Sequence, residues 1–181
     1  MRKSLVLVII VVWARTKLLI WDYVFEPVKE IGISYEGKHP EMMYKKIHEL
    51  IRLVFNVPEG YIQEKDYRWE KKKDREQFDI QWEVTKIFDT YTYVAIEIDL
   101  SGFVIVEGDG KAKIRLRPRL ITEYPQDTVW QQSIIYEMMR RFWHKSFYHR
   151  KRMEYLYISK ELIIEFERKI KEYMEEIRST R

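Results

Sequence analysis

The hydrophobic pattern changes its period along the chain, and this change limits the fold more than any other feature. Between Tyr61 and Ile121 apolar side chains recur at every second position, most clearly in the stretch FDIQWEV at 78–84. Because successive side chains of a strand point to opposite faces, this period predicts strands with one apolar and one polar face. SerGly at 101–102 and GlyAspGly at 108–110 are turn signals that predict hairpins in series. We therefore expect an antiparallel β-meander over this region.

Apolar residues return to helical spacing on both sides of the meander. One amphipathic helix is expected to begin at HisProGlu, residues 39–41, and to end within 56–60. A second helix is expected from Asp127 to Tyr157, and Ser159 is the expected cap of a third. The pattern predicts the α+β class, with the meander wrapped around the long helix and an extra amphipathic helix at the C-terminus.

The chain length and the N-terminal sequence define the domain organisation. A chain of 181 residues fits one domain, which we place at 23–158, with an apolar segment at 1–22 before it and a helix at 159–181 packed on it. Leu5 to Ala14 is a run of ten apolar residues after Arg2 and Lys3. The run suits a buried strand, a membrane or interfacial anchor, or a cleaved signal. We expect a cytoplasmic protein that this segment could bring to a membrane surface.

Cysteine usage and charge exclude several function classes. The chain has no Cys, which excludes disulfides, thiolate metal sites and thiol nucleophiles. Charged residues make up 34% of the chain but leave a net charge of only +4, so a basic surface must come from the placement of cations. Many Glu, Lys and Arg without Cys is a composition reported for hyperthermophile proteins, archaeal ones included.

The residue types that carry catalysis do not form a known motif. The four histidines have neither HisGluXaaXaaHis spacing nor any other i,i+4 pair: they are His39, His48, His144 and His149. Ser133 and Ser146 lie outside any GlyXaaSerXaaGly turn, and the sequence has no glycine-rich phosphate loop. These features favour a binding protein over an enzyme, without a metal or a cofactor.

The order strand, helix, antiparallel meander and long C-terminal helix, over about Val24–Tyr157, resembles the helix-grip superfamily of START-like, or SRPBCC, proteins. The chain departs from that pattern in having one helix after the first strand, where the family has two, and an extra helix at its end. In this superfamily a sheet wraps a long terminal helix and encloses an apolar cavity. The resemblance implies binding of an apolar or amphipathic, lipid-like ligand or of a partner segment. It rests on element order and carries no residue motif.

An aromatic cavity between sheet and helix is therefore the expected binding site. Apolar positions of the strands and of the long helix are expected to line it. These positions are Trp82, Ile96, Ile114, Leu116, Trp130, Ile134, Met138 and Phe142. The predicted function is that of a non-enzymatic protein that holds a lipid-like molecule or a partner segment there.

Cations occupy every second position of the last predicted strand, KAKIRLRPRL at 111–120. They form one row on its polar face: Lys111, Lys113, Arg115, Arg117 and Arg119. The row could meet the phosphates of a nucleic acid or of lipid headgroups. Acids alternate on the neighbouring strands, however, at Asp79, Glu83, Glu97 and Asp99. We favour ion pairs between these acids and the row.

A second basic cluster lies at 140–152, where cations are interleaved with aromatic residues. Its candidate contact residues are Arg140, Arg141, Lys145 and Arg152. The composition suits phosphate contacts combined with base stacking, and it also suits a helix that lies in a membrane interface. The alternative function is a nucleic-acid-binding accessory protein that uses this helix and the strand at 111–119.

Overall fold

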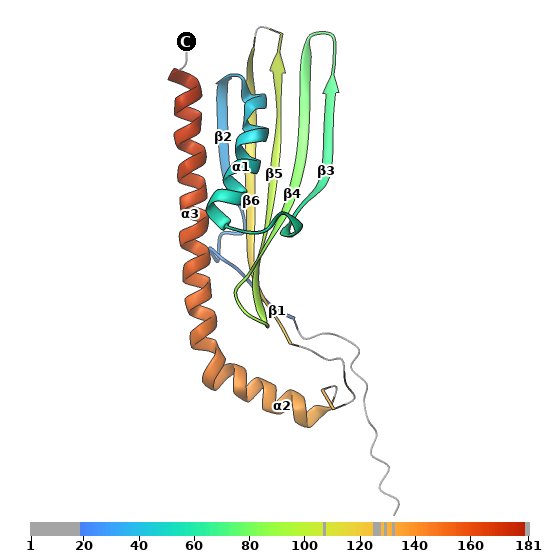
Figure 1. Ribbon diagram of the computed structural model, residues 1–181, viewed down its shortest axis with the longest axis vertical. Coiled ribbons are helices and arrows are strands. Elements are labelled where there is room, and N and C mark those ends of the chain that lie inside the picture. The colour runs from blue at the N-terminus through green and yellow to red at the C-terminus, as the bar shows by residue number, and fades with distance from the viewer. Residues whose placement is uncertain (1–18, 107, 125–127, 129, 132, 180–181) are drawn as a thin grey trace, which may run out of the picture.

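A six-stranded antiparallel sheet forms the centre of the structure, a computed structural model that describes residues 19–106, 108–124, 128, 130–131 and 133–179 (Figure 1). The strand order is β1-β6-β5-β4-β3, and β2 also pairs with β6. The strands are β1 (Leu19–Tyr23), β2 (Ile31–Lys38), β3 (Ile62–Lys71), β4 (Arg75–Ile87), β5 (Thr92–Ile105) and β6 (Asp109–Glu123). Since β3, β4 and β5 each pair with the next strand along the chain, the predicted meander is confirmed.

β1 and β2 lie one after the other along the same edge of β6. β1 pairs with the end of β6, with Leu19 opposite Glu123, whereas β2 pairs with the first half, with Ile31 opposite Leu116. The chain therefore enters the described part of the structure beside the last residue of β6. That is the end of the sheet from which the chain leaves for the C-terminal helices.

Two long helices cover the apolar face of the sheet. α1 (Met43–Phe55) follows the 3-10 turn η1 (Pro40–Met42), and a second such turn, η2 (Glu59–Tyr61), leads into β3. The C-terminal region is one helical run of 46 residues. It consists of α2 (Ile134–Trp143), the π-helical segment η3 (His144–Tyr148) and α3 (His149–Ser179). α3 lies along the sheet, whereas α2 bends away beyond the end of the sheet (Figure 1).

The core lies between this sheet face, α1 and α3. Strand positions that the alternation predicted to be apolar and buried, such as Phe78, Ile80 and Trp82, are at most 1% exposed. α1 and α3 meet in the core through Phe55 and Phe166, whose ring centroids are 5.0 Å apart. Burial of side chains of this size contributes roughly 1.5–3 kcal/mol each. The α+β class is confirmed, and the arrangement is compatible with a helix-grip-like fold.

The part of the C-terminal helix that packs on the sheet differs from the expectation. Its buried apolar residues come from the segment predicted as an extra helix: Ile163, Phe166, Ile170, Met174 and Ile177. Ser159, the expected cap of that helix, lies inside α3 and its Oγ donates to Tyr155 O at 2.7 Å. α3 therefore passes residue 158 without a break. The sheet packs against α3, the second part of the helical run, because α2 at its start extends past the end of the strands.

The apolar run Leu5–Ala14 lies outside the described residues, so the three interpretations of it stay predictions. Of the helices formed by the residues that the structure describes, none is long and apolar enough to cross a bilayer.

Candidate functional site

Half of the residues expected to line a cavity lie in the core. Trp82, Ile96, Ile114 and Leu116 are all 0% exposed and pack among the other buried apolar side chains. Trp82 also borders a surface groove of about 390 Å³ between α1 and β3. Tyr44 stacks on the indole with ring centroids 5.6 Å apart and closes this side of the core.

The other half lies on the outside of the molecule. Trp130, Ile134, Met138 and Phe142 are 58–67% exposed. This corrects the expectation that they line an interior site between sheet and helix. The reason is geometric: Ile134, Met138 and Phe142 belong to α2, and α2 continues beyond the end of the sheet instead of lying across it (Figure 1).

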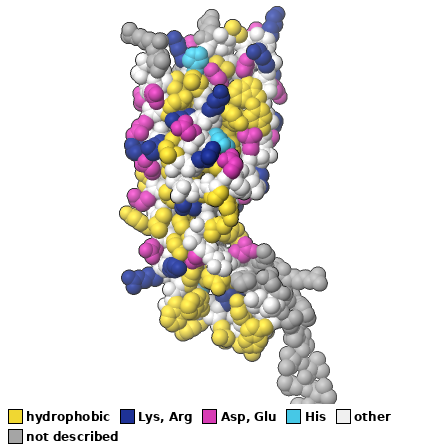
Figure 2. Space-filling view, viewed as in Figure 1, with side chains coloured by type: hydrophobic (Ala, Val, Ile, Leu, Met, Phe, Trp, Pro, Cys, Tyr) yellow, Lys and Arg dark blue, Asp and Glu magenta, His cyan; other side chains and the backbone are white. Residues whose placement is uncertain are grey.

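Together with their neighbours these residues form one exposed apolar surface, which we call the α2 face. Its members are 51–67% exposed: Trp130, Ile134, Ile135, Met138, Met139, Phe142, Trp143 and Phe147. Within α2 they recur at intervals of three and four residues, so they share one side of the helix. Hydrophobic side chains gather over this end of the molecule in Figure 2.

The size of the α2 face distinguishes it from ordinary scattered exposure. A large aromatic side chain has roughly 150–250 Å² to bury, so half to two thirds exposure leaves on the order of 100 Å² for each residue. The four aromatic members and the four Ile and Met members, whose side chains are only somewhat smaller, together expose on the order of 800 Å², whereas the largest apolar patch on a typical monomer is about 300–600 Å². A surface of this size marks a place where the protein meets an apolar partner.

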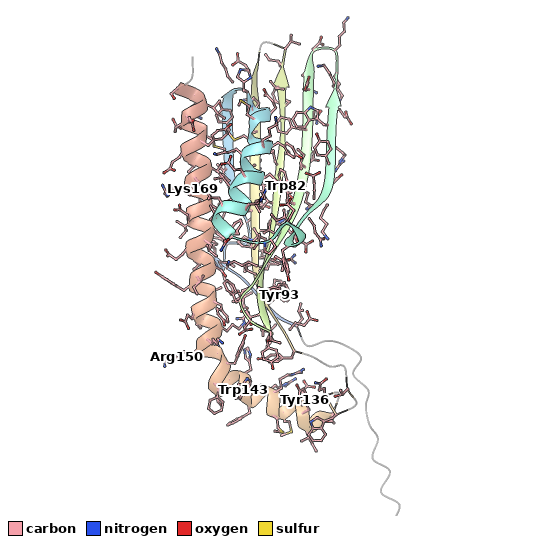
Figure 3. The ribbon with its side chains drawn as sticks, viewed as in Figure 1. Trp82, Tyr93, Tyr136, Trp143, Arg150 and Lys169 are labelled. Carbon is pink, nitrogen blue, oxygen red and sulfur yellow. The ribbon has the colours of Figure 1, made fainter. Side chains whose placement is uncertain are left out.

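α2 is held in place by its polar side. Ser133 caps the helix, because its Oγ accepts from Tyr136 N at 3.2 Å. Arg140, the one buried residue of α2, places its guanidinium over the rings of Tyr124 and Tyr136, at 5.6 and 6.0 Å from the centroids. These contacts turn the polar side of α2 toward the sheet and the apolar side outward. Figure 3 shows Tyr136 and Trp143 on α2, below the end of the sheet.

A polar cluster around Asp89, in the turn between β4 and β5, joins the sheet to η3 and α3. Asp89 Oδ1 accepts from the backbone N–H groups of Tyr91 and Thr92 at 2.8 and 2.9 Å. The hydroxyl of Tyr148 donates to the same carboxylate at 2.9 Å, and that of Tyr155 at 3.1 Å. One carboxylate therefore fixes the strand turn, the π-helical segment and the start of α3 relative to one another.

Arg152 extends this cluster to the other edge of the sheet. Its side chain is only 3% exposed, and its Nη1 lies 2.5 Å from Asp22 Oδ2 in β1. Its Nε donates to Thr122 Oγ1 at 3.1 Å, and Nη2 donates to Leu120 O at 3.3 Å, both in β6. A buried charge is tolerated when it is paired and hydrogen-bonded, and Arg152 is both.

The protonation states of the cluster suit a structural role. Burial raises the pKa of Asp89, but the hydrogen bonds from Tyr91, Tyr148 and Thr92 outweigh it and hold the pKa below its ordinary value. Burial raises the pKa of Tyr148, and it raises the pKa of Tyr124 to about 12. Both phenols therefore remain donors and Asp89 remains an ionised acceptor at neutral pH. Burial and then the charge of Arg152 lower the pKa of His144, whose Nδ1 lies 2.8 Å from Tyr124 Oη.

Sequence reasoning missed this cluster. Asp89 and Tyr148 are 59 residues apart, so no local pattern joins them. The only local signal is Asp89 itself, because an Asp that accepts from the N–H groups two and three residues later is a common turn residue.

Most cations of the row on β6 form ion pairs with acidic side chains, as the sequence predicted. Arg117 pairs with Asp99 at 2.9 Å and with Glu97 at 3.1 Å. The other pairs of the row are Arg115 with Asp99, Arg119 with Glu97 and Lys111 with Glu36. Asp79 and Glu83 pair with Arg68 and Lys65 of β3 instead. Lys113 is exposed. Most of the row is therefore neutralised within the sheet.

The four basic residues predicted as contacts on the helix do not share one surface. Arg140 and Arg152 are 5% and 2% exposed and belong to the contacts described above. Arg141 and Lys145 lie on the surface, and Arg141 pairs with Glu137 at 2.7 Å.

No protein-family model matches the chain, and no curated protein is similar to it in sequence. Within the described residues, no group of three or more His, Asp and Glu side chains is placed to hold a metal ion.

Proposed function

We propose that this chain is a peripheral membrane-binding protein whose α2 face lies in the interface of a lipid bilayer. The observation that carries the proposal is the exposure of this face at the end of the sheet. The lipid-like ligand expected from the sequence is then met on the surface of the molecule and not in a cavity. A helix with an apolar side, a polar side and low mean hydropathy lies in the interface plane and does not span the bilayer.

The aromatic residues of the α2 face support this proposal. Trp130, Phe142, Trp143 and Phe147 are all more than half exposed. Indole and phenyl rings are costly to hydrate, and Trp is favoured where the apolar part of a membrane meets its headgroups. Each apolar side chain that leaves water contributes roughly 1.5–3 kcal/mol if its burial is complete.

The position of the N-terminus also supports it. Leu19 and Trp21 of β1 are 44% and 46% exposed at the same end of the sheet as α2. The apolar run Leu5–Ala14 precedes them in the sequence. One weak anchor gives only reversible membrane binding, and stable anchoring takes two signals. We therefore include this run in the proposed contact.

We also propose that the chain is a divergent helix-grip protein. The antiparallel sheet and the long C-terminal helix on its apolar face support this relationship. The closed contact between α1, α3 and the sheet, with Phe55 against Phe166, leaves the exposed end of the molecule as the better candidate for its amphipathic ligand.

Vesicle sedimentation with the full chain tests the membrane proposal. The double variant Met138→Glu/Phe142→Glu should bind vesicles more than about tenfold more weakly, because it places two carboxylates where apolar groups leave water. The matched control is Leu53→Glu/Val106→Glu. Leu53 lies on α1 and is 62% exposed, and Val106 lies in the turn between β5 and β6 and is 83% exposed. The control should bind as the unchanged chain does.

Light scattering of the same proteins adds the competing outcome. In this outcome the unchanged chain does not bind vesicles but forms a dimer, and the variant Met138→Glu/Phe142→Glu is a monomer. The α2 face would then be an interface between copies of the chain, and the membrane proposal would be wrong.

A further inference from the structure

One rim of the α2 face carries cations. Ile134, Met138, Arg141 and Lys145 follow one another at i, i+4, i+7 and i+11, so they form a single stripe along the helix. Arg141 is 70% exposed on its side chain, and Lys145 is exposed as well. The apolar face therefore passes directly into a basic rim on this side of α2.

Acids are sparse in this part of the chain and lie at Glu137 and Glu154, on either side of a basic stretch. From Met138 to Met153 the sequence contains six cations and no Asp or Glu. Arg140 and Arg152 are buried, which leaves Arg141, Lys145, Arg150 and Lys151 at the surface. Figure 3 shows Arg150 at the bend between α2 and α3.

We call these four surface cations the basic rim, and they are less completely paired than the cations of the β6 row. Arg141 pairs with Glu137, and Lys151 lies 3.6 Å from Asp89, which Tyr148 and Tyr155 already occupy. Lys145 and Arg150 have no ion-pair partner within the part of the chain that the structure describes. Two of these four surface cations therefore leave their positive charge unbalanced close to the α2 face.

We propose that the membrane partner is an anionic phospholipid surface, whose phosphates the basic rim contacts while the α2 face enters the acyl region. The inference rests on the proposed function. Long Lys and Arg side chains can follow the apolar surface with their stems and place the charged group at headgroup level. A basic residue near an anionic bilayer strengthens binding by about fivefold, and the effect weakens with salt.

Two kinds of vesicle separate this inference from the proposed function. The full chain should bind phosphatidylcholine vesicles that contain phosphatidylglycerol more than about tenfold more tightly than vesicles of phosphatidylcholine alone, and added salt should reduce the difference. The variant Lys145→Gln/Arg150→Gln should lose about 25-fold on the anionic vesicles and keep its affinity for the neutral ones. The matched control is Lys38→Gln/Lys73→Gln, which removes two exposed cations at the far end of the molecule and should behave as the unchanged chain does.

The outcomes are distinct. Equal, salt-independent binding to both vesicles would overturn the anionic-lipid inference and leave the membrane proposal standing. Binding to neither vesicle overturns both. A third outcome would assign the rim to nucleic acid instead. In that case the unchanged chain binds a single-stranded RNA oligonucleotide but no vesicles, and the variant Lys145→Gln/Arg150→Gln no longer binds the RNA.

Discussion

Asp89 connects three elements through one short side chain. Its carboxylate accepts hydrogen bonds from its own turn, from Tyr148 in η3 and from Tyr155 in α3. Because α2 has a single buried residue, Arg140, its direction depends largely on the polar contacts that fix η3. Asp89 therefore helps to determine where the α2 face points, although it lies in a turn of the sheet.

Removing the charge of Asp89 should lower the stability of the fold in a pH-dependent way. The folded state holds the pKa of Asp89 below its unfolded value, which is about 3.9. The stabilisation is therefore present above about pH 4 and is lost as the pH falls below that value. Asp89→Asn should lower the free energy of unfolding by about 2–3 kcal/mol near neutral pH, since hydrogen bonds to a charged group are lost.

Thermal unfolding followed by circular dichroism, from about pH 7 down to about pH 3, measures this effect. The difference between the unchanged chain and Asp89→Asn should shrink toward the acid end. Asp74→Asn, a change of an exposed turn residue, is the control and should shift stability by less than about 0.5 kcal/mol. A difference that stays constant over the whole range would show that the charge of Asp89 has no part in stability.

At the level of elements, the period predicted the strands β3 to β6 and the helical segments, but not which part of the C-terminal helical run packs on the sheet. The alternation at 78–84 placed Phe78, Ile80 and Trp82 in the core correctly. The stripes at 130–147 and 162–177 are both apolar, and the first carries more aromatic residues, so it was the natural candidate for the core. The deciding fact is the length of the sheet relative to the helical run, which no local pattern contains.

The candidate site shows the same limit. Met138 and Phe142 were predicted from their helical spacing to line a cavity, but both are 67% exposed, because burial depends on what lies opposite a stripe. The partners of Arg152 in β1 and β6 could not be predicted either, because they come from distant parts of the chain. Ion pairs of the β6 row were predictable, since neighbouring strands of a meander are neighbours in sequence.

Two phenylalanine substitutions test whether α3 packs on the sheet and α2 does not. Phe166→Ala in α3 should cost about 3–5 kcal/mol, because the ring is 0% exposed and packs on Phe55. Phe142→Ala in α2 should change stability by less than about 0.5 kcal/mol, because this ring is 67% exposed. Chemical denaturation of both variants measures the costs. Similar costs for the two changes would mean that α2 also packs on the domain.

At the scale of the whole molecule, the fold separates two ends. α3 contains 31 residues, which corresponds to a helix of about 46 Å. The α2 face lies at one end of this length, and the turn between β3 and β4 lies at the other (Figure 1). A protein bound through α2 would therefore hold the β3–β4 turn on the order of 40 Å or more from the bilayer surface.

Site-specific labelling tests this account most directly, because the chain has no native Cys and a single introduced one can be labelled alone. An environment-sensitive fluorophore is attached to Met139→Cys on the α2 face or to Lys73→Cys in the β3–β4 turn, and anionic vesicles are added to each full-length protein. The account predicts a blue-shifted, brighter emission from the label at position 139 and an unchanged spectrum from the label at position 73. An unchanged spectrum at position 139, or equal shifts at both positions, would contradict it.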